Sequence, residues 1–141
     1  MKVLTREECL EFMMAQPRTA KIATVRADGR PHVAPIWFYL DGDALMFTTW
    51  HTTVKAANLK RDPRVCLVVD DETPPFAFVQ YEGVASVVDD LDALLYWATK
   101  IGGRYMGADQ AEAFGKRNAV PGELLLRVEL TKMMGRDKMS E

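Results

Sequence analysis

The stretch from Lys21 to Thr49 reads KIATVRADGRPHVAPIWFYLDGDALMFTT and contains three apolar runs separated by two short turns. The first turn, Ala27–Arg30, carries an Asp-Gly pair, which is a strong hairpin signal. The second turn is Asp41–Asp43. Strands joined by turns this short pair antiparallel, because a parallel connection needs a long crossover. The stretch therefore predicts an antiparallel sheet.

Further strands follow the stretch from Lys21 to Thr49, and six strands are predicted in total. They are residues 21–26, 31–40, 44–49, 65–69, 76–88 and 123–133. Val65–Val69 reads VCLVV, a run typical of a strand buried on both faces. Pro35 predicts an edge position or a bulge, since proline cannot donate to a ladder, and Gly83 predicts a bulge. Six antiparallel strands tend to close on themselves, so we expect a small barrel.

Helices are predicted around this barrel. Thr5 and Glu8 form a capping box for a first helix, which Pro17 stops. A second helix starts near Thr52 or Thr53 and ends near Asp62–Pro63. A third runs from Asp89–Asp92 to Lys100, where Ile101–Gly102–Gly103 breaks it, and a fourth covers residues 108–117. The last residues, GRDKMSE, are expected to form a loose tail. The expected class is mainly β with peripheral helices.

Composition limits the classes of function. The chain has 141 residues, which suits one domain spanning residues 1–141, and a net charge of -2. That charge gives no reason to expect nucleic acid or an anionic membrane as a partner. Acidic residues interrupt the N-terminal segment, and no run approaches the ~20 apolar residues of a membrane span. Cys9 and Cys66 are expected to be free thiols in a reducing compartment. We expect a soluble, cytoplasmic protein.

Motifs of metal or nucleophilic catalysis are missing from the sequence. His32 and His51 are its two histidines, and neither has a partner at metal-ligand spacing. His32 is expected at the surface or at a strand end. His51, just before the second helix, has a better claim to a functional role. We predict no metal site, and no catalytic residue can be assigned.

The segment FTTWHTTVKAANLKRDP, Phe47–Pro63, places Lys55 in the first turn of the second helix. The macrodipole is already positive there, so a lysine is unfavourable unless an anion lies beside it. Free backbone N–H groups and the hydroxyl groups of nearby threonines would help to bind such an anion. Asn58 follows one turn later on the same side. The segment equally fits a solvated basic helix whose threonines only cap it.

The order of these segments resembles a known family. ATVRADGRPHVAPIWFYLDGD followed by FTTWHTTVKAANLKRDPRVCLVVDDETPPFAFVQYEGVA is similar to the pyridoxamine-phosphate-oxidase-like split-barrel flavoproteins. Within them it looks like the flavin/deazaflavin oxidoreductase B group, which uses the deazaflavin F420. GRYMG (Gly103–Gly107) and RNAVPGE (Arg117–Glu123) are typical of one subset. The resemblance implies a six-stranded split barrel that forms a homodimer with cofactor sites at the interface.

The resemblance also implies which residues contact the cofactor. Its phosphate would lie against Lys55 and Thr53, where some relatives carry an arginine in place of Thr53. The wider set implied is Thr48, Thr49, Val54 and Asn58 near the phosphate, Pro35, Ile36, Trp37 and Phe78 near the ring, and Tyr105, Met106 and Asn118 toward the partner's cofactor. Trp37 and Phe38 alternate along a strand, so only one of them can face the ligand.

The implied activity is F420H2-dependent hydride transfer to a small unsaturated or conjugated substrate, with the cofactor supplying the chemistry. Two alternatives stay open. One is an FMN-dependent enzyme acting on a pyridoxamine-phosphate-like compound. The other is a non-catalytic F420- or flavin-binding protein. Nothing in the sequence identifies the substrate or a proton donor.

Overall fold

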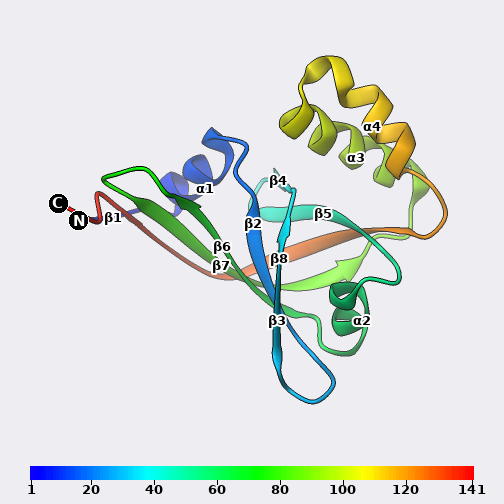
Figure 1. Ribbon diagram of the computed structural model, residues 1–141, viewed down its shortest axis with the longest axis horizontal. Coiled ribbons are helices and arrows are strands. Elements are labelled where there is room, and N and C mark those ends of the chain that lie inside the picture. Colours follow the sequence, from blue (N-terminus) through cyan, green and yellow to red (C-terminus); the bar gives the residue numbers. More distant parts are fainter.

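The computed structural model describes all residues, 1–141, and consists of a sheet surrounded by helices (Figure 1). The strands are β1 Lys2–Val3, β2 Ala20–Val25, β3 Pro31–Ile36, β4 Tyr39–Asp41, β5 Ala44–Trp50, β6 Arg64–Asp71, β7 Ala77–Val87 and β8 Glu123–Asp137. The helices are α1 Arg6–Ala15, α2 Val54–Arg61, α3 Leu91–Met106, the 3₁₀ helix η1 Ala108–Gln110 and α4 Ala111–Asn118.

All strand pairs are antiparallel, as predicted, in the order β3-β2-β6-β7-β8-β5-β4, with β1 paired to β8. The two ends of this order, β3 and β4, are consecutive in the chain and separated only by Trp37 and Phe38. The sheet therefore curls into a barrel that stays open at these two residues. The fold is a split barrel, mainly β with peripheral helices.

The predicted single strand 31–40 is wrong, because the chain leaves the ladder at Trp37 and Phe38 and divides into β3 and β4. The main chain of Phe38 bonds instead to side chains of α3, as described below. Together with the short β1, this division raises the strand count from the predicted six to eight. The edge position expected from Pro35 is confirmed, since β3 pairs only with β2.

The core fills the inside of the barrel, and β2, β6 and most of β7 turn alternate residues toward it. Large buried members of the core include Phe38, Phe47 and Tyr81. The strand VCLVV is not buried on both faces as predicted. Cys66 and Val68 are only half-buried, because β6 is part of a barrel wall with one face inward and one outward.

The bulge predicted at Gly83 is confirmed by a register shift between Glu82 and Gly83 in the β7–β8 ladder. A Cβ atom on Gly83 would lie 2.4 Å from the carbonyl oxygen of Glu129. Glycine is therefore required there by the close approach of the two main chains.

The first two helices follow the predictions closely. Thr5 and Glu8 make the capping box of α1, and Thr53 caps α2, with Asp62 at its end. The third helix does not stop at Lys100 but continues to Met106. A Cβ atom on Gly102 would lie 2.5 Å from Cβ of Phe114 in α4. The glycine pair thus serves close packing of α3 against α4, which lie side by side in Figure 1, rather than ending the helix.

The expected loose tail is also incorrect in part. Gly135–Asp137 belong to β8, where Arg136 pairs with Phe78 of β7 and with Val3 of β1. Both chain ends lie together at the left of Figure 1. Both cysteines are free thiols, Cys9 buried and Cys66 half-buried. None of the helices combines the length and the hydrophobicity that a membrane span requires.

Candidate functional site

The helix start singled out in the sequence lies beside the open part of the barrel. A cavity of about 260 Å³ lies there, and we call it the Lys55 cavity. Its lining residues are Pro35, Ile36, Trp37, Thr48, Lys55, Ala98, Ile101, Gly102 and Asn118. Six of these were predicted from the sequence, although they come from β3, the split, β5, α2 and α4.

The threonines around α2 divide between two roles. Thr53 accepts a hydrogen bond from the N–H of Ala56 (3.2 Å) and donates one to the carbonyl of Trp50 (3.0 Å). Because the single hydroxyl proton of Thr53 is used in this way, the 2.8 Å contact with Thr49 is donated by Thr49. These two hydroxyl groups therefore build the cap. Thr48, on the other face of β5, lines the cavity instead.

Lys55 is half-buried at the second position of α2 and lines the cavity together with Thr48. The N–H groups of Val54 and Lys55 have no acceptor within the helix, since they precede its first complete turn. A helix N-terminus, a lysine ammonium and a threonine hydroxyl thus come together. This donor set fits a phosphate group.

Trp37 forms the wall of the cavity at the barrel split. Its ring stacks on Tyr105, with 5.0 Å between the ring centroids and 4° between the planes, and also touches Phe114. Phe38 is fully buried in the core. Only one of the two residues faces the cavity, as expected: Trp37 does and Phe38 does not, although both lie in the break between β3 and β4 and not in a strand.

Tyr105 supports Trp37 from within the same chain. Its hydroxyl donates to the carbonyl of Arg18 (2.8 Å) and accepts from the N–H of Phe38 (3.3 Å). Burial raises the pKa of Tyr105 above its ordinary value. Tyr105 and Met106 were predicted to approach the cofactor of the partner subunit; within their own chain neither lines the Lys55 cavity, and Met106 is exposed. Asn118, predicted with them, does line it.

Asn58 has a supporting position rather than a lining one. It is 3% exposed, and its amide donates to the hydroxyl of Thr24 (2.9 Å) and accepts from Arg61 (3.1 Å). Arg61 in turn donates to the carbonyl of Val25 (2.7 Å). The side chain therefore fixes α2 onto β2, which holds the helix start in place.

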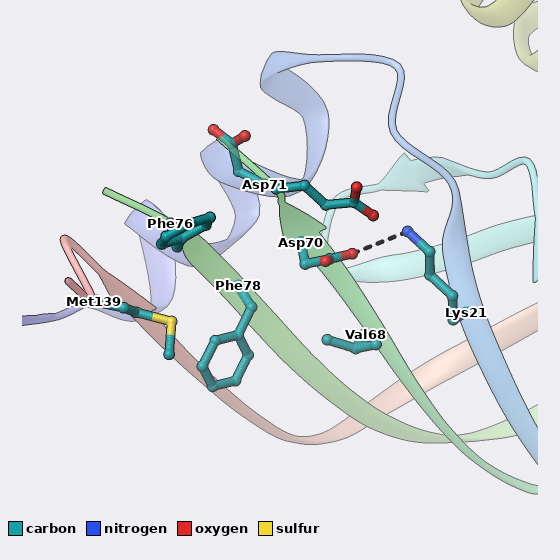
Figure 2. A pocket seen from close by; sticks show the side chains of 8 residues that line it. Lys21, Val68, Asp70, Asp71, Phe76, Phe78 and Met139 are labelled. Atoms are coloured by element: carbon teal, nitrogen blue, oxygen red, sulfur yellow. Dashed lines mark hydrogen bonds and ion pairs between the residues drawn. The ribbon is translucent and has the colours of Figure 1, made fainter. Parts of the chain in front are cut away.

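Phe78 lies at a different site, in a cavity of about 540 Å³ on the outer face of the sheet (Figure 2). We call this the Phe78 cavity. Figure 2 shows Phe76, Phe78 and Met139 on one side of it and Lys21 on the other, bonded to Asp70 at 3.0 Å. The structure does not bring Phe78 into the Lys55 cavity.

Glu123 is a residue of this region that the sequence analysis missed. It starts β8 opposite Trp50, and burial raises its pKa, while the Thr48 hydroxyl and the charge of Lys55 act in the opposite direction. The contribution of α3 was also missed, since Ala98, Ile101 and Gly102 line the cavity. The uninterrupted apolar pattern of Leu94, Ala98 and Ile101 is the signal that could have revealed it.

The histidines take no part in the cavity. His51 is exposed and its Nδ1 lies 3.1 Å from the carbonyl of Gly122, while His32 is half-buried on β3. No group of three or more metal-ligating side chains is found.

An antiparallel barrel that is opened at one strand break defines the class of split-barrel proteins. The family model for pyridoxamine 5'-phosphate oxidase matches residues 5–133. The chain therefore belongs to the pyridoxamine 5'-phosphate oxidase family.

Solved structures of other proteins are similar to this chain. A structure of the conserved hypothetical protein Rv2991 from Mycobacterium tuberculosis is 27% identical, with a TM-score of 0.85 over 98% of this chain and 88% of that one. A structure described as an F420 reductase is 29% identical, with a TM-score of 0.68 over 87% of this chain and 94% of that one.

A curated relative, the pyridoxine/pyridoxamine 5'-phosphate oxidase of Cupriavidus metallidurans, is 27% identical over 113 residues, which cover 75% of this chain and 50% of the relative. The chain thus spans about half the length of the curated relative that it matches.

Proposed function

We propose that this protein is an oxidoreductase that binds the deazaflavin F420 in the Lys55 cavity and uses its reduced form to reduce a small unsaturated or conjugated organic substrate. The observation that carries the proposal is the convergence of Lys55, Thr48 and the start of α2 at the cavity that Pro35, Ile36 and Trp37 also line. Family membership supports a flavin-type cofactor. The similar structure described as an F420 reductase supports the choice of F420.

Different residues of the Lys55 cavity would contact different parts of the cofactor. Lys55, Thr48 and the free N–H groups of α2 would hold the phosphate, and Asn58 keeps that helix start in position from behind. Pro35, Ile36 and Trp37 would lie along the ring system, with Trp37 fixed by its stacking on Tyr105. The bound cofactor supplies the hydride, so no protein nucleophile is required.

We also propose that the working form is a homodimer. The Lys55 cavity, at about 260 Å³, is smaller than the ~300–1,000 Å³ of typical small-molecule pockets, so further walls are needed around a whole cofactor. The outer face of the sheet next to Pro35 carries Val33, which is 66% exposed. A second copy packed on that face would complete the site. A monomer in sedimentation, with cofactor added, would contradict this part of the proposal.

FMN is the alternative cofactor, because membership of the pyridoxamine 5'-phosphate oxidase family supports a flavin-type cofactor without choosing between FMN and F420. Titration of the purified protein with F420 and with FMN separates the two. F420 should bind at micromolar level or better and at least about tenfold more tightly than FMN, a difference of about 1.4 kcal/mol. A protein purified with FMN bound, or a preference for FMN, would exclude the F420 proposal. Tight F420 binding without turnover of any member of a broad substrate panel would indicate a binding protein instead.

A further inference from the structure

A further cavity lies on the face of α3 next to the one that lines the Lys55 cavity. It measures about 450 Å³, and we call it the Lys100 cavity. Its lining residues are Met14, Tyr39, Thr99, Lys100, Gly103, Arg104, Ala108 and Ala111. None of them lines the Lys55 cavity, so the two cavities are separate and α3 forms a wall of each.

The charged side chains that line the Lys100 cavity are all positive. Lys100 and Arg104 line it, and no carboxylate is among its lining residues. Arg104 is committed to the protein, since it donates to the carbonyls of Phe38, Met13 and Gln16. These acceptors are neutral, so the positive charge of the guanidinium is not cancelled.

Lys100 is the group available to a ligand. Its ammonium lies 5.0 Å from the ring centroid of Tyr39 and 5.4 Å from that of Tyr96, which is the geometry of a cation–π contact. It takes part in none of the salt bridges of the chain. Trp97 packs against both tyrosines, with ring centroids 6.0 Å from Tyr39 and 5.0 Å from Tyr96, so the rings that hold the ammonium are themselves fixed.

The rest of the wall is small and apolar. Met14, Gly103, Ala108 and Ala111 present no polar side chain, and the hydroxyl of Thr99 donates to the carbonyl of Leu95 (2.7 Å). The volume is in the range of ~300–1,000 Å³ found for small-molecule pockets. Apolar walls with one ammonium group free to bind at the edge match a compact molecule that has a flat apolar body and one negative group.

We propose that the Lys100 cavity binds small carboxylic acids with a flat, apolar body, and that this site is separate from the Lys55 cavity. The carboxylate pairs with the ammonium of Lys100. The apolar body of the ligand lies against Tyr39, against Ala108 of η1 and against Ala111 of α4. This inference does not rest on the function proposed for the Lys55 cavity.

In the test, the folded protein is titrated with benzoate while its amide chemical shifts are followed by NMR. A second titration uses benzamide, which has the same shape but no charge. Benzoate should shift the amides of Gly103 and Ala111, and benzamide should bind at least about tenfold more weakly, the factor expected for losing one charge-assisted hydrogen bond. Lys100→Gln should weaken benzoate to the level of benzamide, whereas Lys100→Arg should keep most of the affinity. Lys60→Gln, an exposed lysine of α2, is the matched control and should change nothing.

Other outcomes overturn the proposal. Absence of benzoate binding at millimolar concentration would do so, as would equal affinity for benzoate and benzamide. Benzoate affinity unchanged in Lys100→Gln would exclude the ammonium as its partner. Loss of binding in Lys55→Gln rather than in Lys100→Gln would place benzoate in the Lys55 cavity. Affinity of Lys100→Gln for F420 or FMN, measured in parallel, should equal that of the unaltered protein, which separates this test from that of the proposed function.

Discussion

Arg104 of α3 donates a hydrogen bond of 2.7 Å to the carbonyl of Phe38, and the adjacent Tyr105 accepts one from the N–H of the same residue. Phe38 lies in the break between β3 and β4, where no neighbouring strand pairs with it. Two side chains of one helix therefore take the place of a ladder partner. The guanidinium of Arg104 also lies over the ring of Phe38, 4.5 Å from its centroid.

Arg104→Met should lower the free energy of unfolding by about 2–4 kcal/mol, because the carbonyls of Phe38, Met13 and Gln16 lose a charged donor. Urea denaturation followed by circular dichroism measures the change. Arg30→Met, in the exposed first hairpin, is the control and should cost less than about 1 kcal/mol, as expected for an exposed ion pair. Equal losses in the two variants would show that Arg104 does not support the split.

Lys55→Ala should weaken cofactor binding by about 1.5–3 kcal/mol, the contribution of one charge-assisted hydrogen bond. Isothermal titration calorimetry measures it. Lys60→Ala removes an exposed lysine from the same helix and should leave the affinity nearly unchanged. If Lys55→Ala binds as tightly as the unaltered protein, the phosphate does not lie at the start of α2.

Asn58→Ala should lower stability by about 1–3 kcal/mol, because the buried hydroxyl of Thr24 loses its partner. Below the unfolding transition, its cofactor affinity should change far less than that of Lys55→Ala, since Asn58 does not line the cavity. Denaturation and calorimetry on the same preparation give both quantities. A large loss of affinity with unchanged stability would instead make Asn58 a direct cofactor ligand.

Gly115→Ala should destabilise the packing of α4 on α3. Its Cβ would lie 2.0 Å from Oγ1 and 3.0 Å from Cβ of Thr99, and relieving this overlap should cost about 1–3 kcal/mol. That cost exceeds the gain of about 1 kcal/mol expected for alanine over glycine within a helix. The double variant with Thr99→Ala removes the hydroxyl and should recover part of the loss. Additive effects in this double-mutant cycle would argue against the contact.

Glu123→Gln should stabilise the protein at neutral pH. Burial raises the pKa of Glu123 above its ordinary value of 4.5, so the folded state favours the protonated form and the ionised form opposes folding. The destabilisation by the ionised form is absent at pH values below the ordinary pKa of Glu123. It grows as the pH rises above that value and is complete above the raised pKa of the folded state. The urea midpoints of the two proteins should therefore differ at pH 7 and converge near pH 4. If the urea midpoints differ more at pH 4 than at pH 7, the pKa of Glu123 is not raised in the folded state.

The parts of the fold that were predicted from sequence are those fixed by neighbours in the chain. The capping box of Thr5 and Glu8, the Asp-Gly hairpin and the limits of α2 depend on residues within one turn of each other. The break at Phe38 was missed because its partners, Arg104 and Tyr105, lie far along the chain. From sequence, PHVAPIWFYL gives an unbroken strand pattern.

In the candidate site too, features that depend on nearby residues were predicted, whereas features that depend on distant residues were not. Lys55 was found because its charge is unfavourable at a helix start unless an anion is present. Asn58 shares that side of the helix by spacing, but its partner Thr24 comes from β2, and that long-range bond turns it inward. Gly102 and Gly103 were interpreted as a helix break because glycine disfavours helices in isolation. Only the approach of Phe114 to Gly102 and of Ala111 to Gly103 shows that they serve packing.

The position of α3 between two cavities has a thermodynamic consequence. Ala98, Ile101 and Gly102 face one cavity, and the interleaved Thr99, Lys100 and Gly103 face the other. A ligand that displaces this helix from either side alters the shape offered to the second ligand. Equilibrium linkage then requires reciprocity: whatever factor the first ligand imposes on the affinity of the second, the second imposes on the first.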